Sequence, residues 1–241
     1  MYLEGLKVNM KITKYSYPTP VSIALLSDLH NKEYKEILEI VKQLKPEIIC
    51  VTGDVIYGHH EETDMPIVEK QKNVLPFLRG CAEIAPTFFS LGNHESALTD
   101  IDIDLINNTG VKMLNNEYTV YKNVIIGGLT SAHCTDDILN DIWLDDYEKQ
   151  IGFKILLCHH PEYRDSDLSE RNIDLILCGH CHGGQIRLFD RGLFAPGQGW
   201  LPKYTKGIYG NMIVSTGLAN TGGIIPRLFN PREVVFISND I

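Results

Sequence analysis

The chain has 241 residues, of which 44% are hydrophobic and 22% are charged, and its formal net charge is −9. This length suffices for one large α/β domain with a sizeable core, and the composition argues against a disordered or fibrous protein. An acidic chain binds polyanions poorly, so a nucleic-acid polymer is not an expected partner unless bound cations recruit its phosphates.

Short apolar runs alternate with amphipathic stretches through the first half of the chain. The apolar runs predict strands at 21–28, 47–54 and 85–95. Between them, the stretches 33–45 and 65–80 predict helices, of which the first is ended by Pro46 and the second has Pro66 in its first turn. This alternation predicts a parallel sheet with crossover helices.

The second half is poorer in helical patterns and richer in short strands with glycine-rich turns. Its predicted strands lie at 118–129, 153–161, 173–180, 184–189, 211–217 and 232–238. We expect these strands to form a mixed or antiparallel sheet that packs on the first sheet. Because no linker, low-complexity tract or repeat separates the halves, residues 1–241 are predicted to form a single domain.

No apolar run approaches the roughly 20 residues that a membrane-spanning helix needs. The first 20 residues, MYLEGLKVNMKITKYSYPTP, lack the basic flank and apolar core of a signal peptide. We therefore expect a cytoplasmic protein, and leave open whether it is peripheral at a membrane surface. An anchor removed from the N-terminus would leave no trace in this sequence.

Polar side chains follow five of the predicted strands, at the points where those strands end. The turns are Ser27-Asp28-Leu29-His30, Gly53-Asp54, Gly92-Asn93-His94-Glu95, His159-His160-Pro161 and Gly179-His180-Cys181-His182. Ligands of open α/β sheets bind beyond the carboxyl ends of the strands. One such turn is ordinary, since Asp after Gly can cap a helix and Asn-His can form a plain turn. Five such turns in one chain favour a functional site over coincidence.

The reactive groups in these turns are carboxylates, one amide oxygen and imidazoles. This set favours Mn²⁺, Fe or Zn²⁺ over Ca²⁺ or a thiolate zinc cage. Even seven such groups, fewer than these turns contain, exceed the needs of one tetrahedral ion. They suit two divalent metal ions that share one carboxylate, which stand about 3.5–4 Å apart in two-metal hydrolases.

The order D-x-H, GD, GNHE, a strand-end His and GHCH, over residues 28–182, resembles the calcineurin-like metallophosphoesterase superfamily. The tail, from HGGQIRL to STGLANTGGIIPRLFNPREVVFI, further resembles the bacterial branch whose best-known members cleave UDP-diacylglucosamine. The resemblance implies an α/β fold, a four-layer α-β-β-α sandwich with two mixed sheets and flanking helices. It also implies a dinuclear metal-dependent phosphoesterase that hydrolyses a phosphodiester, pyrophosphate or phosphomonoester by attack of a metal-bound hydroxide.

The same resemblance assigns roles position by position. One metal ion would be held by Asp28, His30, Asp54 and His182. The second ion would be held by Asp54, which bridges, together with Asn93, His159 and His180. His94 would face the substrate without binding metal, and would stabilise or protonate the leaving oxygen. One departure from the commonest pattern is Glu95, which stands where Asp is frequent.

A second departure is the doubled histidine at the end of one strand. His159 directly follows the apolar run KILLC, where the family has its ligand, and adjacent side chains of an extended segment project to opposite sides. We therefore predict that His159 is the ligand. His160 is expected to cap the turn or line the rim, so that its replacement by alanine would change mainly the Michaelis constant.

The segment Cys178-Gly179-His180-Cys181 permits another interpretation, because C-x-x-C is the spacing of a dithiol redox site. Such a site opens a helix, whereas Cys181 is followed by HGGQIRL, which predicts a strand. We expect Cys178 to be a core residue, Cys181 to point away from the metals, and the six cysteines to form no disulfide framework. The alternatives to the enzyme are thus a dithiol oxidoreductase and a catalytically silent metal-binding scaffold.

The sequence identifies no substrate-binding residue. The segment 187–209 contains Arg187, Arg191, Lys203, Lys206, Trp200, Tyr204 and Tyr209. It is either a loop that receives a sugar, base or lipid head group beside the metals, or a long surface hairpin whose aromatic residues pack on the sheet. The expected partner is a small phosphorylated substrate, with a nucleotide-sugar lipid among the candidates, and no obligate protein partner is evident.

Overall fold

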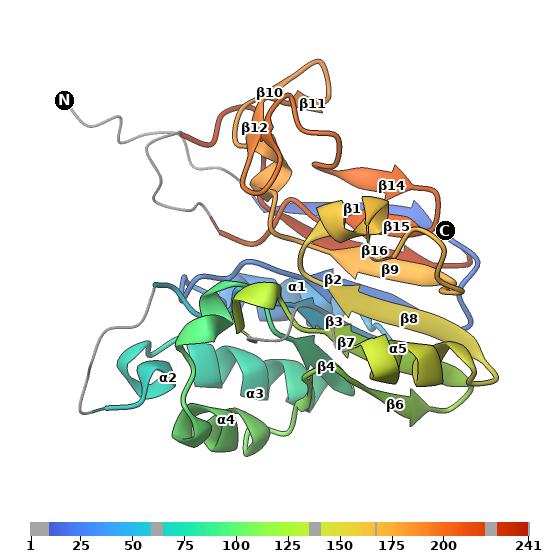
Figure 1. Ribbon diagram of the computed structural model, residues 1–241. Helices are drawn as coiled ribbons and strands as arrows, with labels where there is room; N and C mark the ends of the chain where they lie inside the picture. The colour runs from blue at the N-terminus through green and yellow to red at the C-terminus, as the bar shows by residue number, and fades with distance from the viewer. Residues whose placement is uncertain (1–9, 59–64, 135–140, 167, 220–225, 241) are drawn as a thin grey trace.

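The structure, a computed structural model, describes residues 10–58, 65–134, 141–166, 168–219 and 226–240. Two six-stranded sheets pack face to face through a shared apolar layer, and helices cover their outer faces (Figure 1). The helices in the described part of the chain are all too short or too polar to traverse a bilayer.

The first sheet has the strand order β1-β16-β2-β3-β4-β5. Its strands are β1 (Lys11–Ser16), β2 (Ile23–Leu26), β3 (Ile48–Thr52), β4 (Thr87–Ser90), β5 (Lys112–Leu114) and β16 (Glu233–Ser238). Strands β2 to β5 are parallel, as predicted for the first half. The C-terminal strand β16 lies between β1 and β2 and is antiparallel to β2. The two halves of the sequence therefore do not correspond to the two sheets.

The second sheet has the strand order β14-β15-β9-β8-β7-β6. Its strands are β6 (Glu117–Tyr121), β7 (Val124–Leu129), β8 (Phe153–Cys158), β9 (Leu175–Cys178), β14 (Gly207–Tyr209) and β15 (Met212–Val214). The four central strands are parallel and both edge strands are antiparallel to their neighbours. This confirms a mixed sheet, and shows that the predicted strand 118–129 is the hairpin β6–β7.

The helices complete a four-layer sandwich. They are α1 (Lys35–Leu44), α2 (Ile67–Lys70), α3 (Val74–Ile84), α4 (Asp100–Asn107) and α5 (Asp141–Glu148). Residues of α1 to α4 pack on the first sheet and those of α5 on the second. Strand β2 is buried on both faces, since Ala24 and Leu26 contact the helical layer while Ile23 and Leu25 contact the other sheet. The predicted α-β-β-α architecture is confirmed.

The single helix predicted over 65–80 is wrong, because the structure has two helices separated at residues 71–73. Gln71 accepts a hydrogen bond from the Tyr57 amide at 2.8 Å, and Asn73 Nδ2 donates to the Asn31 carbonyl at 2.8 Å. These contacts tie the break to the loops after β2 and β3. Pro76 also favours a new start, since its missing N–H costs nothing in the first turn of α3.

The segment 187–209 is neither a single hairpin nor an extended loop. It forms the ladders β10 (Arg187–Leu188) with β11 (Arg191–Gly192), and β12 (Phe194–Ala195) with β13 (Gly199–Trp200), before β14. The strand predicted over 184–189 is thus only two residues long. Tyr204 is buried in the apolar cluster on the outer face of the second sheet, whereas Trp200 is exposed.

Candidate metal centre

The turns that follow β2, β3, β4, β8 and β9 converge, and they bring ligand-type side chains together. Four groups among the described residues have ligand atoms within 4.8 Å of one another. They are Asp28, His30 and His182; His30, Asp54 and His94; Asp54, His159 and His180; and His160, Glu162 and His180. The first and second groups share His30, and the second and third share Asp54. Two sheets therefore contribute to one continuous cluster of carboxylates and imidazoles.

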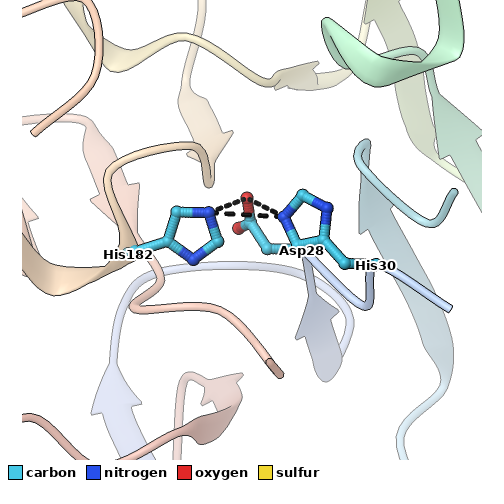
Figure 2. Close-up of side chains that lie close together, drawn as sticks. All are labelled: Asp28, His30 and His182. Atoms are coloured by element: carbon cyan, nitrogen blue, oxygen red, sulfur yellow. Dashed lines mark hydrogen bonds and ion pairs between the residues drawn. The ribbon is translucent and has the colours of Figure 1, made fainter. Parts of the chain in front are cut away.

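The first group is compact and buried. Figure 2 shows the Asp28 carboxylate between the imidazoles of His30 and His182. The two Nε2 atoms are 3.3 Å apart, and Asp28 Oδ1 lies 3.5 Å from His182 Nε2 and 3.9 Å from His30 Nε2. Burial lowers the pKa of His30 to about 4 and the pKa of His182 well below its usual value. Both imidazoles are therefore neutral, as metal ligands must be.

Asp54 lies between this group and the third one. Its Oδ2 atom is 3.8 Å from His30 Nε2 and 3.1 Å from His159 Nε2, and His159 Nε2 is in turn 3.3 Å from His180 Nδ1. Burial disfavours a charged His159, but the Asp54 carboxylate raises the pKa of His159 to about 10. A cation that binds at His159 Nε2 would therefore have to displace a proton from it. The His159 Nδ1–H donates to the Thr52 carbonyl at 2.6 Å, which turns Nε2 toward Asp54.

Asn93 and His94 occupy the 3₁₀ turn η1 (His94–Ala97) and its N-cap. Asn93 Oδ1 is buried and accepts no hydrogen bond from the described residues, which fits an oxygen that binds a cation. The His94 amide donates to Asp54 Oδ1 at 3.0 Å, and its Nε2 lies 3.8 Å from Asp54 Oδ2. The His94 side chain is 18% exposed, against 9% or less for His30, His159, His180 and His182.

The backbone at the cluster is held in an unfavourable conformation. Positive φ angles between 44° and 67° occur at Asp28, His30, Asp54, His180 and His182. A non-glycine residue in this region costs roughly 1–2 kcal/mol. These residues follow only three strands, β2, β3 and β9, and folding alone does not call for a strained conformation there. The strain therefore points to a functional requirement for these side chains.

Two glycines let the backbone approach the carboxylates. A Cβ atom at Gly179 would lie 1.8 Å from Ser27 Oγ and 2.7 Å from Asp28 Oδ2. At Gly92 it would lie 2.4 Å from Asp54 Oδ1. Neither position can accept a side chain without moving a strand-end carboxylate.

Glu95 is a structural residue of the site that the sequence did not reveal. Its buried carboxylate accepts hydrogen bonds from the amides of Asp54 (2.7 Å), Val55 (2.8 Å), Ile56 (3.3 Å) and Gly92 (2.8 Å). These donors belong to the loops after β3 and β4, so one side chain fixes the relative position of Asp54 and the Asn93–His94 turn. Aspartate, the frequent residue here in the resembled family, has a side chain one methylene shorter.

The structure corrects the expectation for His160. This residue is buried, makes no side-chain cap to the following turn η3 (Pro161–Asp165), and does not line a rim. Its Nε2 is 2.8 Å from Ser131 Oγ and its Nδ1 is 3.1 Å from Glu162 Oε1. The His160 ring centroid is 4.2 Å from that of His180. His160 therefore packs against the ring of the proposed ligand His180. The sequence shows only that residues 159 and 160 are both histidine, and it gives no sign of this contact.

Five of the six cysteines are buried, as predicted for core residues, and Cys134 is half-buried. All six are free, and Cys178 and Cys181 are fully buried. Burial raises the pKa of both thiols well above the usual value, so neither is a reactive thiolate. One detail differs: a 3₁₀ turn, η4 (His182–Gly184), follows Cys181 directly, where a strand was predicted.

Comparisons with known proteins show which family the chain is similar to. Residues 21–184 match the model of the calcineurin-like phosphoesterase family. An uncharacterized metallophosphoesterase of Aquifex aeolicus is 27% identical over 98% of this chain and 92% of its own length. The phosphodiesterase YaeI of Escherichia coli is 26% identical over 70% of this chain and 63% of its own length. The sulfate thiohydrolase SoxB of Thermus thermophilus shares the fold with a TM-score of 0.50, at 11% identity, over 84% of this chain and 53% of its own.

Proposed function

Because this chain belongs to the calcineurin-like phosphoesterase family, whose members are metal-dependent phosphoric ester hydrolases, we propose that it cleaves a phosphodiester or pyrophosphate at a dinuclear centre. One observation supports two ions above all others. Asp54 Oδ2 lies within 4 Å of His30 in one buried group and of His159 in another. A carboxylate oxygen in that position suits a bridge between two cations.

The proposed ligand sets combine members of these groups with the buried amide oxygen of Asn93, and leave His94 for the substrate. Asp28, His30, Asp54 and His182 hold one ion, and Asp54, Asn93, His159 and His180 hold the other. A donor set of imidazoles, carboxylates and an amide oxygen suits Mn²⁺, Zn²⁺ or Fe. When bound, two such ions supply positive charge for the phosphate oxygens and make a water acidic enough to attack phosphorus.

His94 contributes proton transfer in this proposal. The His94 amide donates to Asp54 Oδ1, and the Gly58 amide nitrogen lies 3.2 Å from His94 Nδ1. In the tautomer whose Nδ1 accepts from that amide, the ring hydrogen is on Nε2, the nitrogen directed toward Asp54. Because His94 is also the most exposed of the centre's imidazoles, it can meet a substrate that enters from solvent. We assign to its Nε2–H the proton that the leaving oxygen takes up.

The first test is metal content. We expect about two transition-metal ions per chain, loss of turnover of bis-p-nitrophenyl phosphate after chelation, and recovery with Mn²⁺, Zn²⁺ or Co²⁺. Metal analysis and turnover would be measured on the same samples. Full activity with a single tightly held ion would falsify the dinuclear centre, and two bound ions without any turnover would instead identify a silent scaffold.

The second test replaces His94 with asparagine. Metal content should stay near two ions per chain, while the maximal rate falls by roughly 10²–10⁴-fold for a substrate with a poor leaving group. The loss should be much smaller for a nitrophenyl ester, because nitrophenolate departs without a proton. Equal losses for both esters would exclude the role of His94 as an acid.

The substrate itself is proposed only by class. It is a small phosphorylated molecule, and a nucleotide-sugar lipid is the candidate that the resemblance of the tail suggests. The relative named as a phosphodiesterase supports a diester over a monoester. Rates for phosphomonoesters, phosphodiesters and nucleotide diphosphate sugars, with and without acyl chains, would rank these classes. A preference for soluble monoesters would overturn this substrate proposal while leaving the metal centre intact.

A further inference from the structure

Exposed apolar side chains are concentrated on one part of the molecular surface. We call residues 186–206 and 226–232 the hairpin cap. Among the described residues, every exposed phenylalanine and tryptophan lies on it: Phe189 is 99% exposed, Phe229 81% and Trp200 73%. Leu188 and Leu201 of the hairpin cap are exposed as well. A cluster of exposed apolar side chains commonly marks a binding site for another protein or for a membrane.

The segments that carry these residues are bonded side by side. The Leu201 amide donates to the Leu193 carbonyl, the Leu193 amide to the Ile186 carbonyl, and the Arg187 amide to the Leu228 carbonyl. In Figure 1 the strands β10, β11 and β12 stand together at the top, on the opposite side of the molecule from α3 and α4. The exposed residues therefore project from one contiguous structure.

The backbone makes these residues more unusual. Phe189, Leu201 and Phe229 have φ angles of 48°, 53° and 53°, a region that favours glycine or asparagine. An exposed apolar side chain adds nothing to the core, and a positive φ costs free energy. Since neither packing nor local conformation favours these residues, their apolar character is required by something outside the folded chain.

Charge identifies the kind of partner. The hairpin cap spans 28 residues and carries six of the 22 basic residues of the chain but one of its 31 acidic residues. Arg227 is buried and donates to backbone carbonyls, so five of the six basic side chains reach the surface. Lys203 and Lys206 form ion pairs with Asp165 and Glu233, whereas Arg191 is exposed beside the tip that carries Phe189. An apolar surface with basic residues, in a chain of net charge −9, complements an anionic and apolar body.

We infer that the hairpin cap docks on an anionic phospholipid bilayer. Phe189, Trp200 and Phe229 enter the boundary between head groups and acyl chains, where aromatic side chains are favoured, and Arg191 meets the phosphates. These three aromatic side chains protrude from separate turns, a shape that suits a deformable surface. A Cβ at Gly197, in the turn between β12 and β13, would lie 3.4 Å from His180 Nε2, so docking brings the bilayer close to the metal centre.

The test is flotation of the full chain with vesicles, which measures no hydrolysis and does not depend on the proposed activity. The chain should float with vesicles of phosphatidylcholine and phosphatidylglycerol, and less with phosphatidylcholine alone. The double variant Phe189→Asn/Phe229→Asn should lose at least about tenfold in vesicle affinity, because each phenylalanine removes apolar area from water. Asparagine suits a positive φ, so the variant should unfold at the same temperature or higher.

A matched control is Ile151→Asn, which removes an apolar side chain that is 98% exposed and lies outside the hairpin cap. This variant should float like the unchanged chain. Quenching of Trp200 fluorescence by brominated lipid, in a Trp143→Phe background, should report contact with the acyl boundary. Unchanged flotation of the double variant would overturn the proposal. A second outcome would also overturn it: the unchanged chain does not bind vesicles but self-associates, and the double variant no longer self-associates. That outcome would assign the surface to a second copy of the chain.

Discussion

Asp54→Ala is expected to abolish binding of both metal ions and to lower turnover by at least roughly 10³-fold. Loss of one hydrogen-bond donor that stabilises a transition state already lowers the rate by about 10²–10³-fold. Asp54 Oδ2 faces His30 and His159, so its loss removes a ligand from each proposed ion. Its Oδ1 also accepts the His94 amide hydrogen bond, so the acid would lose its position as well. Metal analysis after reconstitution and turnover of a diester measure both effects.

A matched control is Asp146→Ala, because the Asp146 side chain on helix α5 is 64% exposed and pairs only at the surface with Lys149, which is 73% exposed. That variant should keep two ions and its full rate. Circular dichroism would establish that Asp54→Ala still folds. Retention of two ions and most of the turnover in a folded Asp54→Ala protein would show that Asp54 does not bridge.

The strands that build the centre could be predicted from the sequence for a physical reason. The runs VSIALLSD and EIICVTGD are apolar on both faces of the strand because each is covered by helices on one side and a second sheet on the other. Their polar residues can only lie at the ends. Parallel neighbours end at the same edge of the sheet, so Asp28 and Asp54 had to be close together.

The residues that support the centre could not be predicted in this way. Glu95 binds amides at positions 54–56, about 40 residues earlier in the chain, and no local pattern encodes that contact. The break between α2 and α3 likewise depends on Asn31 and Tyr57, which belong to loops of the first sheet. The helix α4 was missed although Thr99 and Asp102 form a capping box, a signal that is present in the sequence.

His159 is a proposed metal ligand, whereas His160 supports the neighbouring ligand His180. We therefore expect the alanine variants of these two histidines to have different effects. His159→Ala removes Nε2 beside Asp54 and His180, so it should leave the proposed Asp28-side ion bound and the Asn93-side ion lost. Turnover should fall by about 10²-fold or more, because one of the two cations that act on the phosphate is missing.

His160→Ala should instead keep both ions when metal is in excess, because the His160 ring packs against the proposed ligands His159 and His180, while its nitrogens face Ser131 and Glu162. Loss of this support should weaken the Asn93-side ion by about 10–100-fold, as is typical when a residue that orients a metal ligand is removed. Because the His160 side chain is buried, we no longer expect a change confined to the Michaelis constant. Competition with a chelator, followed by metal analysis of both variants, measures the difference. If His160→Ala loses one ion outright while His159→Ala keeps two, the ligand is the second histidine of the pair.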